Sequence, residues 1–230
     1  PILKPTYNHE RGTLEPAQYL APRPYIIVEG LLGYHARAMR DCYDVKIYME
    51  PNEELRIKWK LWRDCNDRGY TAGEAQDELE RRREDSQRFI QPQRTFSDIV
   101  INFCPPKNDD AETGAHLDVH HLLRPTLPHP DLSPLIEAGS RNGLSLELCR
   151  DRDGKPVDVL GISGSISDES AESLENLLWE MLPEAPHLRN NHVGEFTDID
   201  GKPCISHPLV LTQLLIAYHM VKAAHGVHTV

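Results

Sequence analysis

Residues 25–34 read YIIVEGLLGY, and the first five of them form a short apolar run that ends in the acid Glu29, directly before Gly30. Runs of this kind are typical of strands that are buried on both faces of a parallel sheet. We therefore expect a core strand over Tyr25–Glu29 that places the Glu29 carboxylate at its C-terminal end. Such an acid suits a magnesium ion that bridges nucleotide phosphates, and a plain core strand that ends in a solvated glutamate fits the same letters.

The residues after this run predict alternating strands and helices. We expect further strands over 45–49, 98–103, 116–123, 144–149 and 157–162, and helices over 51–68, 72–88, 168–182 and 208–224. This alternation predicts an α/β fold, with helices around a mixed, largely parallel sheet. We expect residues 1–104 to form a core and residues 105–230 to form a C-terminal α/β portion that packs on it.

Charge and composition exclude some classes of function. The 230 residues include 36 acids against 25 lysines and arginines, a net charge of -11. An acidic chain lacks the broad basic surface that nucleic acids and anionic membranes require, so neither is an expected partner. With no apolar stretch long enough to span a bilayer and no export signal in these residues, we expect a cytoplasmic location. The 5 cysteines are widely spaced without a CxxC pair, which predicts free thiols.

A basic cluster lies near the end of the first predicted helix, over residues 51–68. Lys60, Arg63 and Asp64 share one helical face by the i, i+3, i+4 rule, and Arg68 directly precedes Gly69. Arginine donors match the oxygens of a phosphate group, so the cluster suits an anionic ligand. A solvated helix face with Asp–Arg pairs explains the same spacing, and both interpretations stay open at this point.

Two other clusters carry a weaker signal. The next helix contains Arg81, Arg82, Arg83 and Arg88 among several acids, a pattern typical of ion pairs on an exposed helix. On a strand, His116 and His120 would be about 13 Å apart, which is too far for one metal ion. We therefore do not expect a metal site at these histidines.

Four segments in this order resemble the phosphoribulokinase family and, more distantly, uridine kinases, which are P-loop kinases. They are PTYNH at 5–9, IIVEGLLGY at 26–34, RDCYDVKIYMEPNEELRIKWKLWRDCNDRGY at 40–70 and FIQPQRTFSDIVI at 89–101. The match covers about the first 100 residues well, and the stretches HLLRPTLPHPDL and GEFTD are similar to later parts of some bacterial members. The ordered series is more specific than any one motif.

The resemblance implies an activity and a set of site residues. The family transfers the γ-phosphoryl group of ATP to ribulose 5-phosphate and gives ribulose 1,5-bisphosphate, a step of Calvin cycle carbon fixation. Glu29 would act on Mg²⁺ as a catalytic and metal-binding residue. The roles that remain are sugar-phosphate binding for Tyr7, His9, Lys60, Arg63 and Arg68, and a place in the lid region for Arg82. A homodimer is also expected.

The sequence departs from the family pattern in one important respect. It contains no GxxxxGK followed by Ser or Thr, and in the family this phosphate loop and the catalytic aspartate precede the Tyr-Asn-His segment. We therefore expect the first βα units of the fold to be missing and the chain alone to be inactive. The alternatives are a kinase of another sugar or of a nucleoside, as in uridine kinase, and a truncated non-catalytic binding or assembly module.

Overall fold

The computed structural model describes residues 2–8, 11–106, 116–139, 143–190, 192–198 and 201–226. Its elements follow the chain in this order: β1 (Ile2–Asn8), β2 (Thr13–Leu20), α1 (Arg37–Arg40), β3 (Ile47–Met49), α2 (Glu53–Asn66), α3 (Ala72–Arg81), α4 (Arg83–Asp85), η1 (Ser86–Ile90), η2 (Gln91–Phe96), β4 (Ile99–Cys104), β5 (Asp118–Leu123), α5 (Ser133–Gly139), β6 (Leu144–Arg150), β7 (Pro156–Ile162), α6 (Asp168–Glu180), η4 (Pro186–Leu188), β8 (Glu195–Thr197), β9 (Pro203–Ile205) and α7 (His207–Ala224).

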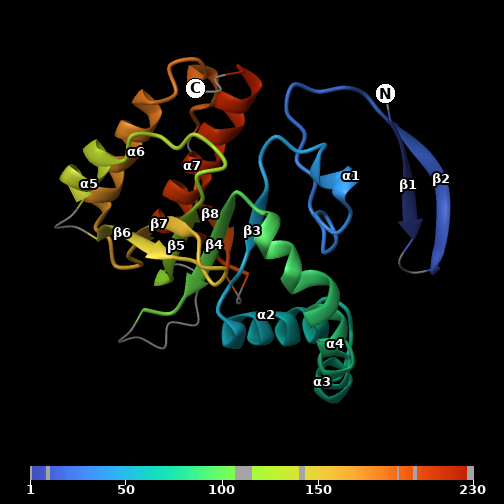
Figure 1. The fold of residues 1–230 in the computed structure, drawn as a ribbon. Helices are drawn as coiled ribbons and strands as arrows, with labels where there is room; N and C mark the ends of the chain where they lie inside the picture. The colour runs from blue at the N-terminus through green and yellow to red at the C-terminus, as the bar shows by residue number, and fades with distance from the viewer. Residues whose placement is uncertain are drawn as a thin grey trace.

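A mixed sheet in the order β3-β4-β5-β7-β6 organises the described residues (Figure 1). It takes β3 and β4 from the first 104 residues and the other strands from the remainder. The predicted α/β class and the mixed sheet flanked by helices are confirmed. The expectation of a largely parallel sheet is corrected, because within the described chain β3 and β4 run parallel while β4–β5, β5–β7 and β6–β7 are antiparallel.

Connection length explains this strand arrangement. A parallel pair needs a crossover connection, whereas antiparallel neighbours can be joined by a short turn. Helices α2 to η2 supply the crossover between β3 and β4, and a turn over residues 151–155 joins β6 to β7. The strand alternation of β5 then turns Val119, His121 and Leu123 toward the core.

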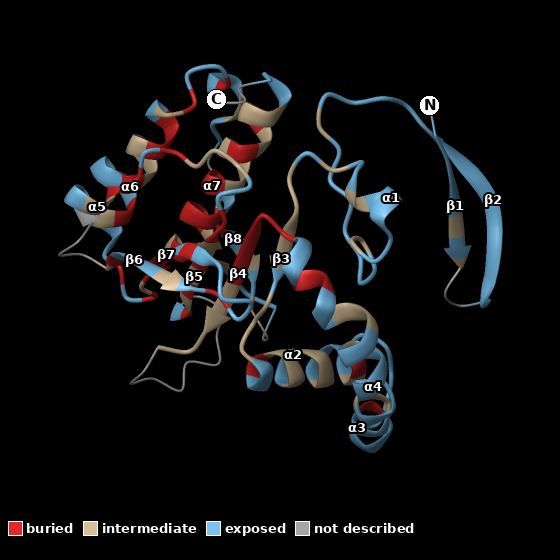
Figure 2. Ribbon diagram, in the orientation of Figure 1, coloured by how far each residue is buried: buried red, intermediate tan, exposed pale blue. Residues whose placement is uncertain are grey.

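Helices α5, α6 and α7 lie together against one side of the sheet, and the hydrophobic core fills the space between them (Figures 1 and 2). Both long helices begin as the sequence predicts, because Ser167 and Ser206 accept hydrogen bonds from the first-turn amides. The core joins strand residues to helix residues: Ile99, Ile101, Val119, Leu123, Leu160, Ile162, Leu174, Leu178, Leu211 and Leu214.

The predicted strand over Tyr25–Glu29 is wrong. Residues 26–28 form no strand, and the side chains of Ile26, Ile27 and Val28 are 62%, 79% and 62% exposed. An apolar run is buried in a sheet only when neighbouring strands pair with it on its edges, and the described sheet ends at β3. The β1–β2 hairpin that precedes this run is also largely exposed (Figure 2).

Two further features are the state of the cysteines and the character of the helices. All 5 cysteines are free, as predicted, and they are only partly buried or exposed. Within the described ranges, no helix has both the length and the apolar character needed to cross a membrane.

Candidate functional site

A buried carboxylate gathers the three basic side chains predicted at the end of α2. Asp64 is 3% exposed, and Lys60 Nζ donates to its Oδ2 atom. Its Oδ1 atom accepts from Arg63 Nη2 and from Arg68 Nη1, each at 3.2 Å. We call these four residues the Asp64 cluster. Because three cations surround one carboxylate, the cluster keeps an excess of positive charge.

Local sequence signals build this cluster. Asn52 caps α2 by accepting from the amides of Glu54 and Leu55, which sets where the helix begins. Lys60, Asp64 and Arg68 follow at i, i+4 spacing, so their side chains meet on one side. Gly69 adopts a φ of 73°, the left-handed conformation that glycine tolerates, and the amide of Tyr70 then donates to the Asp64 carbonyl.

The environment of Asp64 keeps it ionised. Burial by itself would raise the pKa of this carboxyl, but hydrogen bonds from Lys60 and Arg63 outweigh burial and hold the pKa below its ordinary value. The side chains of Arg63 and Arg68 remain 47% and 54% exposed, whereas that of Lys60 is 20% exposed. A buried carboxylate beneath solvent-facing guanidinium groups leaves donors free to contact an anionic ligand.

Sequence reasoning missed the central role of Asp64, which it treated only as a partner of the arginines. The i, i+4 spacing on both sides of Asp64 is the signal that identifies it. Its burial could not be read from the spacing, since that depends on what packs against α2.

The structure places Glu29 on an exposed segment without regular secondary structure, just before Gly30. Magnesium prefers oxygen ligands and is often held by one or two carboxylates together with phosphates and water. A single accessible carboxylate such as Glu29 could be one of these ligands, with phosphates and water as the others. One carboxylate could not hold the ion by protein side chains alone. Within the described residues, no group of three or more His, Cys, Asp or Glu side chains gathers.

The other predicted site residues are not brought into the Asp64 cluster by any contact between described residues. Tyr7 lies on strand β1 of the hairpin and is 50% exposed. His9 lies outside the described residues. Arg82 lies between α3 and α4 and pairs with Glu78 on the exposed surface, as the sequence predicts for this helix. Their roles in the site stay predictions.

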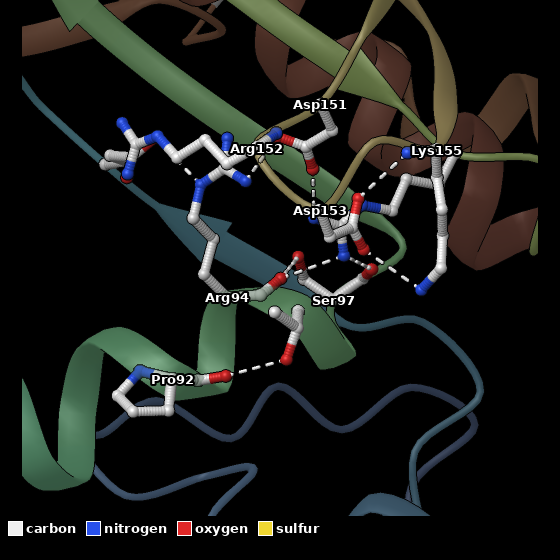
Figure 3. A network of polar contacts seen from close by, with 10 residues as sticks. Pro92, Arg94, Ser97, Asp151, Arg152, Asp153 and Lys155 are labelled. Carbon is white, nitrogen blue, oxygen red and sulfur yellow. Dashed lines mark hydrogen bonds and ion pairs between the residues drawn. The ribbon is translucent and has the colours of Figure 1, made fainter.

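A second buried ion network joins η2 to the sheet (Figure 3). Arg94 Nη1 donates to Asp151 Oδ1 at 2.6 Å and Arg94 Nε donates to Glu50 at 3.0 Å. Arg124 donates to the other oxygen of Asp151 at 2.5 Å. Burial opposes ionisation of Asp151, but the two guanidinium groups lower its pKa to about 2. This network fixes η2 against the turn between β6 and β7.

Comparison with known proteins bears on the first half of the chain. Residues 2–109 match the family described as the Phosphoribulokinase / Uridine kinase family. The phosphoribulokinase of Synechocystis sp. is 34% identical over 139 residues, which cover 60% of this chain and 42% of that protein. The chloroplastic phosphoribulokinase of Triticum aestivum is 35% identical over 141 residues, covering 60% of this chain and 35% of that protein.

The more distant similarity is also confirmed. The uridine kinase of Listeria welshimeri is 33% identical over 102 residues, which cover 44% of this chain and 49% of that protein. The chain therefore spans less than half the length of each of these relatives. The resemblance to a phosphoribulokinase-like P-loop kinase, drawn above from four segments, holds for the part of the chain that contains Glu29 and the Asp64 cluster.

Proposed function

We propose that this protein is an ATP-dependent kinase that phosphorylates ribulose 5-phosphate and gives ribulose 1,5-bisphosphate for Calvin cycle carbon fixation. The observation that carries the proposal is the convergence of Lys60, Arg63 and Arg68 on the buried Asp64 carboxylate. The cluster lies within residues 2–109, the range that matches the kinase family. Similarity to two phosphoribulokinases supports the choice of the sugar phosphate as acceptor.

In this proposal the residues of the chain position charges, since phosphoryl transfer requires little covalent chemistry from a protein. Arg63 and Arg68 donate to the phosphate of the sugar, and Asp64 holds both guanidinium groups in place. Tyr7 and His9 border the same substrate, and Arg82 belongs to a lid. Mg²⁺, held through Glu29, supplies charge neutralisation on the nucleotide phosphates when it is bound.

A second candidate function is phosphorylation of a nucleoside, which the similarity to uridine kinase favours. The resemblance to uridine kinases implies a further arginine directly after the Arg68–Gly69 pair, and this chain has Tyr70 there. An uncharged side chain at this position favours the sugar-phosphate acceptor. A non-catalytic binding module is the third possibility.

Several wider features belong to the proposal. We place the division between the kinase core and the C-terminal portion at residue 104, close to residue 109 where the family match ends. We also propose a homodimer and a cytoplasmic location. Light scattering on the purified protein tests the first of these, with a mass of twice the monomer expected.

A direct assay tests the proposed function. The longest native form of the protein is incubated with ATP and Mg²⁺, with either ribulose 5-phosphate or uridine as acceptor, and the products are identified by mass spectrometry. We expect ribulose 1,5-bisphosphate. Formation of uridine monophosphate alone would favour the second candidate, and no product in any native form would favour the binding module.

A matched assay uses residues 1–230 alone. These residues contain no phosphate loop, so we expect no turnover of ATP. Ribulose 1,5-bisphosphate from a preparation whose intact mass corresponds to Pro1–Val230 would contradict this expectation.

A further inference from the structure

The side chain of Gln93 lies buried between two chain segments that are far apart in the sequence. It is 4% exposed, and its Oε1 atom accepts from the amide of Tyr34 at 2.7 Å. Its Nε2 group donates to the carbonyl of Leu31 at 2.8 Å and to that of Phe89 at 2.7 Å. One amide therefore uses its acceptor and both donors, and it joins η2 to the loop over residues 31–34.

This loop directly follows Glu29 and Gly30, and apolar packing holds it only weakly. Leu31 and Leu32 are 67% and 50% exposed, and the side chains of residues 26–28 before them are exposed as well. Polar contacts hold it instead, because the Tyr34 hydroxyl donates to the Ile47 carbonyl at 2.5 Å and Arg40 donates to the Tyr34 carbonyl at 2.7 Å. Gln93 adds the contact nearest to Glu29, through Leu31.

The position of Gln93 is itself fixed by its neighbour. Arg94 is 7% exposed and is bound to Asp151 and Glu50, so η2 is held against the sheet. Figure 3 shows Arg94 reaching the turn that carries Asp151. Two consecutive residues of η2 thus connect the sheet, through Arg94, to the loop over residues 31–34, through Gln93.

We propose that Gln93 is a positioning residue that sets the location of the Glu29 carboxylate through the loop 31–34. The proposal rests on the proposed function, which gives Glu29 its role at Mg²⁺. A residue that supplies one acceptor and two donors at these three sites must be an amide of this length. Leucine at this position would leave the half-buried Tyr34 amide hydrogen and two carbonyls without the Gln93 side chain as partner, and ionised glutamate would keep only the acceptor.

The first test measures the loop directly and needs no catalysis. In Gln93→Leu we expect the Tyr34 amide of the 230-residue chain to exchange with deuterium about 5- to 150-fold faster, which corresponds to losing its hydrogen bond to Gln93. Gln93→Glu should accelerate it less, because the acceptor remains. Gln91→Leu is the matched control, since Gln91 is an exposed glutamine of the same η2 helix. Unchanged exchange in a folded Gln93→Leu chain would overturn the proposal.

The second test separates positioning from a general structural effect. In the longest native form, a displaced carboxylate should lower kcat on the order of 10- to 100-fold, with little change in KM for ribulose 5-phosphate, whereas Gln91→Leu should leave both unchanged. If Gln93 acts through Glu29, the double variant Glu29→Gln with Gln93→Leu loses no more activity than Glu29→Gln alone.

The outcomes distinguish the two proposals. Suppose that Glu29→Gln lowers kcat and that the double variant lowers it further, by the product of the two single losses. This result would overturn the role of Gln93 and leave the proposed function standing. Wild-type kcat in Glu29→Gln at saturating Mg²⁺ would remove the role of Glu29 itself, and the role of Gln93 in positioning it would fall with it. Where Gln93→Leu does not fold, Gln93→Glu carries the same comparison.

Discussion

Arg63 and Arg68 show how long side chains overcome an unfavourable helical spacing. Five residues along a helix change the side-chain direction by roughly 140° from one residue to the other. Both guanidinium groups nevertheless contact the same oxygen of Asp64, Arg63 from within the last turn of α2 and Arg68 from just beyond it. The carboxylate thus gathers charges that the helix alone would separate.

Removal of either arginine should weaken binding of the sugar phosphate. A charge-assisted hydrogen bond is worth about 1.5 to 3 kcal/mol, so Arg63→Ala and Arg68→Ala should each raise KM for ribulose 5-phosphate about 10- to 150-fold, with a smaller change for ATP. Titration of each substrate at saturating levels of the other measures this. Arg56→Ala is the control on the same helix, because Arg56 pairs with Glu53 outside the cluster. Equal losses for both substrates would instead place the arginines at the transferring group.

The proposed role of Glu29 at Mg²⁺ predicts an effect on kcat. Replacing its charged oxygen in Glu29→Gln should remove stabilisation of the transition state and lower kcat about 100-fold, with folding preserved because the side chain is exposed. Steady-state kinetics across a range of Mg²⁺ concentrations measures the effect. Glu54→Gln at an exposed position of α2 serves as the control, and wild-type kcat in Glu29→Gln would make Glu29 a bystander.

Among the elements, η2 has a structural importance greater than its length of 6 residues suggests. Gln93 and Arg94 are both buried, and each joins η2 to residues more than 40 positions away in the chain. Short helices of this type have little stability of their own, since few hydrogen bonds offset the cost of ordering them. The contacts of these two side chains hold the element in place.

The ion network of η2 predicts a stability loss in Asp151→Asn. Removing one partner of a buried ion pair costs about 3 to 5 kcal/mol. In Asp151→Asn the buried Arg124 loses its counter-charge, and Arg94 keeps only Glu50. Urea denaturation at pH 7 measures the change in free energy of unfolding. Asp153→Asn in the same turn is the control, as Asp153 pairs with Lys155 at the surface, and its effect should be much smaller. Equal effects would show that burial of Asp151 is unimportant.

For the whole molecule, two buried histidines predict how stability depends on pH. Burial lowers the pKa of His121 to about 3 and that of His219 to about 4. The folded state therefore keeps both rings neutral at pH values where the unfolded chain, with an ordinary pKa of about 6.5, takes up protons. The stability that the two neutral rings contribute is fully present above pH 6.5. It is lost as the pH falls, down to about pH 4 for His219 and about pH 3 for His121.

The histidine prediction can be checked by urea denaturation between pH 7 and pH 4. Each ring should contribute a slope of about 1.4 kcal/mol per pH unit to the free energy of unfolding. His219→Phe keeps an aromatic ring beside His129 and should remove one such contribution, whereas His187→Gln at an exposed position should leave the slope unchanged. A slope that does not change in His219→Phe would contradict the assignment.

Much of the fold could be predicted from local patterns along the chain. The cap at Asn52, the stop at Gly69 and the serines before α6 and α7 act through neighbours within six residues, so the sequence identifies these helices. The i, i+4 spacing likewise identifies Lys60, Asp64 and Arg68 of the Asp64 cluster. Strands β4 to β7 followed from their apolar runs and turn residues.

Burial and pairing between distant segments could not be predicted in the same way. The run Ile26–Val28 has the letters of a core strand but is exposed, because burial depends on whether other strands pair with it. Whether two neighbouring strands run parallel or antiparallel also depends on which strands pair in the sheet, and the local sequence does not show this. The contacts of Gln93 with Leu31 and Tyr34 join residues about 60 positions apart, and no periodicity in the letters records them. Short-range hydrogen bonds leave a pattern in the sequence, whereas long-range contacts arise only when the packed chain brings the segments together.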